Sequence, residues 1–407
     1  MSKGLRLDQF KEPAFSSDIL KIDSQRVYID SVYNSPEDSN FKFLFAPGSK
    51  IQKNNIIASK KYKNKIINIF APKDFEVKET KYLINEKDQA TSYVILESNK
   101  LNKSNIISFE SEDINYFQKD LINKTDQEIL DISYKASIID ETDGVYLFEK
   151  FEKLINNKFN NKIYIDAIDD QPYTSSKESI LLHYPNAINF VSLILKKAFN
   201  IDIDIIFYDI ESYNKEKKFS EEVINTNILH IRGNYPVRHH ISKKFNYNFS
   251  IGIQAILHLA RALINPDYKQ TTTFITVSGP AVFDPKNIEV FIGTSTQEII
   301  ENFKLKSNLK RVILGQAITG VAISELQTPV SASTRSILIF DNYNILKQME
   351  CIGCSRCSDV CPQNLLPSYR HKFKETGDQS FEEFSSEAKC IKCYCCSYIC
   401  PSHINLV

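Results

Sequence analysis

The sequence predicts a multidomain protein that combines α/β and α+β units and ends in a cysteine-rich domain. Three observations indicate this fold class. Apolar runs of strand length fill the first part of the chain, and strand-like runs alternate with helix-like runs in the middle part. All nine cysteines lie between Cys351 and Cys400. The length of 407 residues suffices for roughly two to four domains.

Residues 1–125 are predicted to form a mainly β region. Apolar runs such as "FKFLFAPGSKI", "NIIAS" and "TSYVILES" have the length of single strands and are separated by polar breaks. Proline and glycine in "APGSK" and "APKD" indicate turns between these strands.

Residues 126–268 are predicted to form an α/β domain. The runs "NKIYIDAID" (161–169) and "IDIDIIFYD" (201–209) are typical of strands, and the helical run "NAINFVSLILKKAFN" (186–200) stands between them. The run "SIGIQAILHLARALI" (250–264) has the apolar spacing of a buried helix. Alternating strands and helices favour an α/β arrangement.

Residues 269–342 are predicted to form a compact α+β unit. Strand-like runs stand at 271–279 and 287–293, and a short helix is expected over 295–304. Two further strand-like runs, "RVILG" and "RSILIFD", complete this unit.

The composition excludes several function classes. Apolar residues make up 42% and charged residues 25%, as in soluble globular proteins, and the net charge is zero, which argues against a nucleic-acid partner. No run of about 18 apolar residues occurs, so we expect no transmembrane segment. The first residues lack the apolar stretch of a secretory signal. We therefore expect a cytoplasmic protein, with peripheral attachment to the inner face of the cell membrane left open.

The C-terminal region, residues 343–407, contains two cysteine runs with the same spacing, C-x2-C-x2-C-x3-C, each followed by proline. The runs consist of Cys351, Cys354, Cys357 and Cys361, and of Cys390, Cys393, Cys396 and Cys400. This spacing is that of bacterial-type ferredoxins, which bind [4Fe–4S] clusters.

In such two-motif proteins the fourth cysteine of each run binds the cluster of the other run. We therefore predict that the first cluster is held by Cys351, Cys354, Cys357 and Cys400. The second cluster is predicted to be held by Cys390, Cys393, Cys396 and Cys361. This exchange of ligands would bring two [4Fe–4S] clusters close together, as electron transfer between them requires.

Two alternatives to iron–sulfur clusters remain. A structural zinc site normally uses two C-x2-C pairs, which leaves the duplicated eight-cysteine pattern and its prolines unexplained. Disulfides are rare in the cytoplasm. Cys395 lies outside the spacing, and we expect it to be a small buried side chain rather than a ligand or a reactive thiol.

The neighbouring residues His239 and His240 are predicted to lie in a polar loop, because adjacent histidines in a strand point to opposite faces and chelate poorly. Arg238 is expected to pair with a carboxylate. Near the cysteines, Arg356, Lys389 and Lys392 could attract an acidic ferredoxin or flavodoxin, with ordinary surface charge as the alternative.

The cysteine runs "CIGCSRCSDVCPQNLLP" and "CIKCYCCSYICPS" resemble those of the RnfC family, which comprises the RnfC component of the Rnf electron-transport complex and its relatives. These relatives include electron-transfer proteins attached to proline reductase and a cobalamin reductase. The segments 277–300, 311–341 and 165–179 also resemble that family, and 43–58 does so faintly. The resemblance implies an N-terminal barrel-sandwich-like region, a flavin-domain-like α/β fold, a β-grasp unit of the SLBB type and a helical two-cluster ferredoxin domain.

The resemblance also implies flavin mononucleotide (FMN) and NADH binding in the α/β domain, at positions matching Gly144, Asp169 and Tyr173. This chain departs from the family there. Asp140, Glu141 and Asp143 stand where the family has a glycine-rich loop, and carboxylates would repel a phosphate. Only 11 glycines occur in the whole chain, and we expect the flavin and NADH site to have degenerated.

A second departure concerns the segment before "PY", where Asp169 and Gln171 replace two glutamates of the family. We therefore predict an electron-transfer protein that relays electrons through two [4Fe–4S] clusters, without a catalytic residue of its own. The donor would be a ferredoxin, a flavoprotein or an Rnf-type complex, and the acceptor a partner reductase such as an amino-acid reductase. The alternatives are an NADH dehydrogenase component of an Rnf-type complex with bound FMN, and a zinc-binding structural module.

Overall fold

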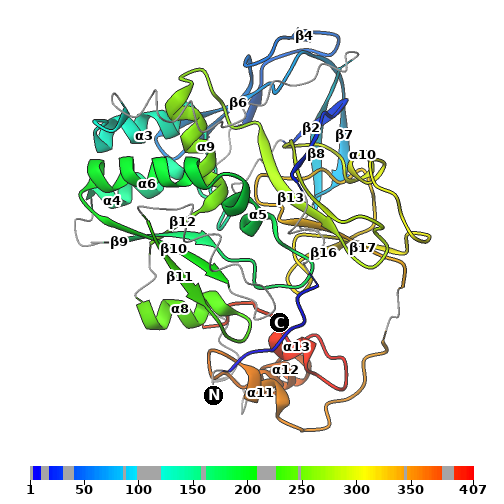
Figure 1. The fold of residues 1–407 in the computed structure, drawn as a ribbon. Helices are drawn as coiled ribbons and strands as arrows, with labels where there is room; N and C mark the ends of the chain where they lie inside the picture. Colours follow the sequence, from blue (N-terminus) through cyan, green and yellow to red (C-terminus); the bar gives the residue numbers. More distant parts are fainter. Residues whose placement is uncertain are drawn as a thin grey trace.

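The fold is known from a computed structural model. It describes residues 3–10, 18–30, 41–85, 89–98, 121–156, 162–208, 226–245, 249–342, 346–377 and 389–407. The strands of these residues form four sheets, and the short helices of the cysteine-rich end lie below them in Figure 1. The mixture of α/β and α+β parts that the sequence predicts is confirmed.

Strands β2 to β8 form two antiparallel sheets, with the orders β2-β8-β7-β4 and β3-β5-β6. Their bounds are β2 Arg26–Asp30, β3 Phe41–Phe43, β4 Lys50–Ile51, β5 Ile56–Tyr62, β6 Lys65–Phe70, β7 Phe75–Ile84 and β8 Ala90–Glu97. Alternate side chains such as Val27, Ile29 and Ile57 point into a shared apolar core. Among the described residues before residue 100, the helices and strands assigned are thus all strands.

The α/β part contains a four-stranded parallel sheet with the order β11-β10-β9-β12. Its strands are β9 Lys162–Ala167, β10 Asp202–Tyr208, β11 Asn227–Ile231 and β12 Ser250–Gly252. Ile203, Ile205 and Phe207 of β10 pack on one face, against a core that includes helices α3 Asp126–Lys135, α4 Leu147–Asn156, α5 Ser176–His183, α6 Pro185–Phe199 and α9 Ile253–Ile264. Ile206 and Tyr208 pack on the other face, where α8 Val237–Phe245 lies (Figure 1).

A mixed six-stranded sheet follows, with the order β1-β14-β13-β17-β15-β16. Its members are β1 Leu20–Ile22, β13 Thr272–Ser278, β14 Lys286–Phe291, β15 Arg311–Leu314, β16 Val321–Ile323 and β17 Ser336–Phe340, with the short helix α10 Thr296–Ile300 beside them. Strand β1 comes from the N-terminal region and pairs in parallel with β14. The N-terminal region thus supplies the edge strand next to β14 in this sheet.

Three local predictions need correction. The helix expected over 250–264 begins only at Ile253, because Ser250–Gly252 pairs with β9. The helix expected over 295–304 ends at Ile300, where the chain turns. The loop predicted around His239 was wrong: these residues form α8, because Val237 and Ile241 are spaced four apart and pack together against the sheet.

The C-terminal part contains α11 Arg356–Val360, α12 Pro367–Thr376 and α13 Cys395–Tyr398. The N-terminal residues run alongside them (Figure 1). The Lys3 ammonium donates to the Ser358 carbonyl, and Leu5 pairs with Tyr235 in a two-residue bridge. None of the described helices has the length and continuous apolar character that crossing a bilayer requires.

One buried ion pair joins the α/β part to the six-stranded sheet. Arg261 of α9 and Glu289 of β14 are both almost completely buried and form a two-pronged pair, to which Thr272 adds a hydrogen bond of 2.8 Å. The Arg261 guanidinium also lies 5.4 Å from the centre of the Phe274 ring. Removing one partner would leave the other as an uncompensated buried charge.

We therefore expect Arg261→Met to lower the free energy of unfolding by about 3–5 kcal/mol, because Glu289 would remain buried without its partner. The matched control is Arg26→Met, which removes the ion pair of Arg26 with Glu97 at 2.8 Å, in which the arginine is 57% exposed. That control should change the free energy by no more than about 1 kcal/mol. Denaturant unfolding followed by circular dichroism measures both, and equal losses would contradict this account of the core.

Candidate iron–sulfur centre

The two cysteine runs fold into the same backbone conformation. Left-handed residues flank the second cysteine of each run: Gly353 and Ser355 in the first, Lys392 and Tyr394 in the second. A short helix then carries the third cysteine, in α11 and α13 respectively. Asn364 and His403 are also left-handed, and each stands two residues after the proline of its run. The repeat seen in the sequence is thus a repeat of structure.

The fourth cysteine of each run is held by equivalent hydrogen bonds. The Cys361 N–H donates to the Ser358 carbonyl, and the Cys400 N–H donates to the Ser397 carbonyl, both at 3.3 Å. Each cysteine carbonyl in turn accepts a hydrogen bond of 3.1 Å from the left-handed residue that follows. The chain thus turns in the same way at the fourth thiol of each run.

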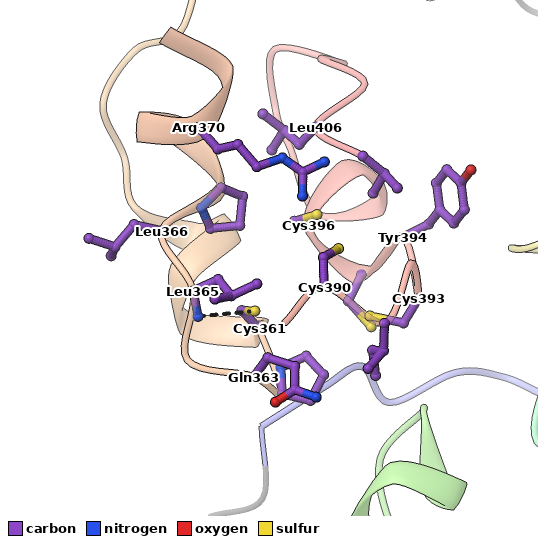
Figure 2. A pocket seen from close by; sticks show the side chains of 15 residues that line it. Cys361, Gln363, Leu365, Leu366, Arg370, Cys390, Cys393, Tyr394, Cys396 and Leu406 are labelled. Atoms are coloured by element: carbon purple, nitrogen blue, oxygen red, sulfur yellow. Dashed lines mark hydrogen bonds between the residues drawn. The ribbon is translucent and has the colours of Figure 1, made fainter. Parts of the chain in front are cut away.

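A cavity brings together cysteines from both runs. Cys361 of the first run lines it with Cys390, Cys393 and Cys396 of the second (Figure 2). These four residues are the set that the sequence predicts for the second cluster. The Leu365 N–H donates to the Cys361 sulfur at 3.4 Å.

The remaining walls of this cavity suit an anionic cluster. Leu365, Leu366 and Leu406 line it and limit the access of water, and the buried Arg370 brings a positive charge (Figure 2). Four thiols, apolar walls and one cation are a donor set and environment that fit an iron–sulfur cluster.

The cysteines predicted for the first cluster are only partly brought together. Cys357 and Cys400, which come from different runs, pack into one apolar cluster with Ile404 and Leu406. Cys351 and Cys354 are exposed on the loop that precedes α11. Among the residues that the structure describes, no three histidine, cysteine or acidic side chains converge as they would around a single metal ion.

Two thiols of the second run have shifted proton affinities. A hydrogen bond from Cys395 lowers the pKa of Cys393 to about 7, and burial raises the pKa of Cys396 to about 11. Thiolates are the ligating form, so Cys396 would have to lose its proton to hold a cluster.

Cys395 itself is fully buried, in agreement with the expectation of a small packed side chain. Its sulfur lies 3.7 Å from the carbonyl oxygen of Tyr235, and both residues pack with Leu5. The burial of Cys395 therefore attaches the second cysteine run to the α/β part of the chain and to the N-terminal segment.

Gln171 and Tyr235 extend this attachment. The Tyr235 hydroxyl donates to the Cys393 carbonyl at 3.1 Å and accepts from the Gln171 amide at 3.3 Å. The same amide donates to Thr319, and its oxygen accepts from the Ile318 N–H. A glutamate at this position would lack the donor, which gives a structural reason for the departure from the family. The sequence singles out Gln171 but indicates no role for Tyr235, because the partners of Tyr235 are distant in the chain.

His239 of α8 also contacts the cysteine-rich part. Its Nε2 atom lies 3.2 Å from the Pro362 carbonyl oxygen, to which the Nε2–H tautomer donates. Arg238 pairs with Asp166 at 2.7 Å, as expected for a carboxylate-paired arginine.

The three candidate flavin residues each have partners within the protein. Gly144 lies in a turn with φ of 73° that is closed by a hydrogen bond to the Asp140 carbonyl. Asp169 accepts hydrogen bonds from the N–H groups of Lys177 and Glu178 at the start of α5. Tyr173 stacks on Phe10 at 5.2 Å.

The acidic segment occupies the N-terminal end of α9. Glu141 accepts hydrogen bonds of 3.2 Å from the N–H groups of Gln254 and Ala255 at the start of α9. A Cβ atom at Gly252 would lie 2.2 Å from this carboxyl group, so the glycine permits the close approach of Glu141. Helix N-termini bind anions, and here a side chain of the protein already fills that position.

Burial raises the pKa of Glu141, while the neighbouring Lys177 opposes that shift from 3.6 Å away. Whether it is protonated or ionised, the Glu141 carboxyl group occupies the N–H groups at the start of α9. Asp140 is paired with Lys150 at 2.7 Å and accepts from the Gly252 N–H. The residues at this helix end therefore do not fit the phosphate of FMN.

Comparison with known proteins identifies the cysteine-rich part. A family model described as a 4Fe-4S dicluster domain matches residues 350–404. The RnfC-type component of the ion-translocating oxidoreductase complex of Pseudomonas aeruginosa is 33% identical over 128 residues, covering 30% of this chain and 16% of that protein. The corresponding component of the proton-translocating ferredoxin:NAD(+) oxidoreductase complex of Clostridium ljungdahlii is 36% identical over 96 residues, covering 23% and 21%.

Among solved structures, a chain of an NAD+-reducing [NiFe]-hydrogenase in the air-oxidized state is similar to this chain, with a TM-score of 0.49 and 13% identity. The match covers 68% of this chain and 56% of the hydrogenase chain. The sequence matches span less than a quarter of these two curated relatives. Their common description and the dicluster domain confirm the predicted resemblance of this chain to the RnfC family.

Proposed function

We propose that this protein transfers electrons through two [4Fe–4S] clusters that its eight motif cysteines hold. One observation carries the proposal: Cys361 of the first run lines the same cavity as Cys390, Cys393 and Cys396 of the second. A protein that binds two clusters through exchanged fourth ligands would have this arrangement, whereas two independent zinc knuckles would not.

A bound [4Fe–4S] cluster accepts or gives one electron without the formation or loss of a covalent bond to a substrate. The protein's own residues would set how readily this happens. Leu365, Leu366 and Leu406 keep water from the second site, and Arg370 favours the more negative state. Tyr235 holds the Cys393 backbone at a fixed position relative to the α/β part.

The loop of the first run is the proposed docking point for a protein donor. Leu346, Met349 and Ile352 are 60%, 55% and 70% exposed around the exposed Cys351 and Cys354. Lys347 and Arg356 are exposed beside them. Glu350 and Asp359 are exposed there too, so the edge carries both signs of charge around an apolar centre, and it is this apolar centre that suits a protein donor such as a ferredoxin or flavodoxin. We propose that electrons enter here from such a donor and pass to a partner reductase or an Rnf-type complex, on the cytoplasmic side of the membrane.

We do not assign NADH oxidation to this chain. Glu141 and Asp169 already bind the N–H groups of α9 and α5, as described above. A protein donor would supply single electrons directly to the clusters and would require neither FMN nor a hydride acceptor.

The function is tested on protein purified without oxygen. We expect about eight iron atoms and a similar amount of acid-labile sulfide per chain, with no stoichiometric flavin. A reduced ferredoxin should bleach the visible absorbance of the clusters, and NADH should not. Zinc without sulfide would refute the proposal in favour of a structural module. One flavin per chain together with reduction by NADH would refute it in favour of a dehydrogenase.

The exchanged ligand gives a second prediction. Cys361→Ala should remove the second cluster and lower the iron content from about eight to about four atoms per chain, although Cys361 belongs to the first run. Cys395→Ala is the matched control, because it removes a buried thiol of the second run that is not a predicted ligand. Iron and sulfide analysis after anaerobic purification compares the two variants. Full iron content in Cys361→Ala would contradict the ligand assignment.

A further inference from the structure

The backbone carbonyl of Cys393 accepts a hydrogen bond from a side chain that is 158 residues away in the sequence. The donor is the Tyr235 hydroxyl, at 3.1 Å. A carbonyl oxygen can only accept, so the hydroxyl donates, and the positive end of its O–H dipole is directed at Cys393. Cys393 lines the cysteine cavity and belongs to the set predicted for the second cluster. The dipole is therefore directed at a predicted cluster ligand.

Gln171 determines which way this hydroxyl is directed. Its amide nitrogen lies 3.3 Å from the Tyr235 oxygen and can only donate, which leaves the hydroxyl proton for Cys393. The amide itself is held in one orientation, because its oxygen accepts from the N–H groups of Ile318 at 2.9 Å and Thr319 at 3.3 Å. Gln171 and Tyr235 therefore form a chain of two donors that ends at the Cys393 carbonyl.

Both members of this donor chain are shielded from water. Tyr235 is 4% exposed and Gln171 is 3% exposed. The Tyr235 backbone exchanges hydrogen bonds of 2.8 and 2.9 Å with Leu5, which fixes the point from which the ring extends. In a buried site a fixed dipole acts on a nearby charge more strongly than in water, and successive hydrogen bonds polarise one another.

The two cysteine runs differ at this position. Cys354 is the second cysteine of the first run, as Cys393 is of the second, and it is exposed. Cys393 is partly buried, and its carbonyl is bonded to Tyr235. Fixed dipoles and hydrogen bonds around the ligands are among the features that set the potential of an iron–sulfur cluster. The donor chain would thus act on the second site.

We propose that Tyr235, oriented by Gln171, is a positioning residue that raises the reduction potential of the second cluster. This inference rests on the proposed function, because it requires a cluster at Cys393. Reduction adds one negative charge at the site, and the positive end of the hydroxyl dipole stabilises that added charge. Without the hydroxyl the second cluster would be harder to reduce, while the first would keep its potential.

The test compares full-length Tyr235→Phe with the unchanged protein, both purified without oxygen and followed by electron paramagnetic resonance during a redox titration. We expect one of two potentials to fall. At a fixed potential the ratio of reduced to oxidised centre should drop about two- to tenfold, or about 20–60 mV for one electron, because one buried hydrogen bond is lost. In Cys361→Ala, which is predicted to keep only the first cluster, adding Tyr235→Phe should shift nothing.

The matched control is Tyr134→Phe, which removes a hydrogen bond of 2.7 Å from a tyrosine hydroxyl to the Ile66 carbonyl. This bond joins α3 to β6, which lie at the opposite end of the molecule from α13 (Figure 1). The control should leave both potentials unchanged. Gln171→Met is a second variant. It should lower the same potential as Tyr235→Phe by a smaller amount, because the hydroxyl remains and only its orienting donor is lost.

Iron and sulfide are measured on every sample, which separates the possible outcomes. At full iron content, unchanged potentials or a raised potential in Tyr235→Phe would overturn the proposal. Loss of about half the iron in both Tyr235→Phe and Gln171→Met would assign the two residues a purely structural role and would also overturn it. Absence of clusters from the unchanged protein would instead overturn the proposed function.

Discussion

The spacing of the cysteines imposes the constraint on which the rest of the structure depends. Three cysteines two residues apart can reach three irons of one cubane, and the chain then turns away, so a fourth ligand has to come from another segment. Here the two runs lie against each other, with Cys361 beside Cys390, Cys393 and Cys396 and with Cys357 beside Cys400. Neither run could complete its proposed site alone.

The rest of the chain holds this pair of runs in place. Tyr235 and Leu5 pack on Cys395, and His239 reaches the Pro362 carbonyl. These contacts come from the α/β part and from the N-terminal segment, so three separated regions of the chain meet at the second run. The α/β part thus supplies contacts to the cysteine-rich part, and Glu141 occupies the N-terminal end of α9.

Local signals predicted much of the fold. Apolar periodicity located β9, β10, β13 and β14 and the helix α6, because each buries a face that its own sequence specifies. The pairing of β1 with β14 could not be predicted, since it depends on contacts between residues far apart in the chain. The helix at His239 was missed because its apolar face consists of only Val237 and Ile241.

The candidate site was likewise predicted only in part from the sequence. The cysteine spacing alone predicted the four cysteines that line the cavity, because the spacing of cluster ligands is a local property of the sequence. The position of Glu141 at the start of α9 could not be foreseen, because it requires segments more than a hundred residues apart to meet. The replacement of glycines by acidic residues at 140–143 could be seen in the sequence, because it does not depend on a tertiary contact.

The closeness of two clusters is tested most directly by electron paramagnetic resonance of the protein after chemical reduction without oxygen. We predict a spectrum that integrates to about two unpaired electrons per chain and shows the broadening of two centres that interact magnetically. A spectrum without a paramagnetic centre, or one from two centres that do not sense each other, would contradict the exchange of ligands between the two cysteine runs.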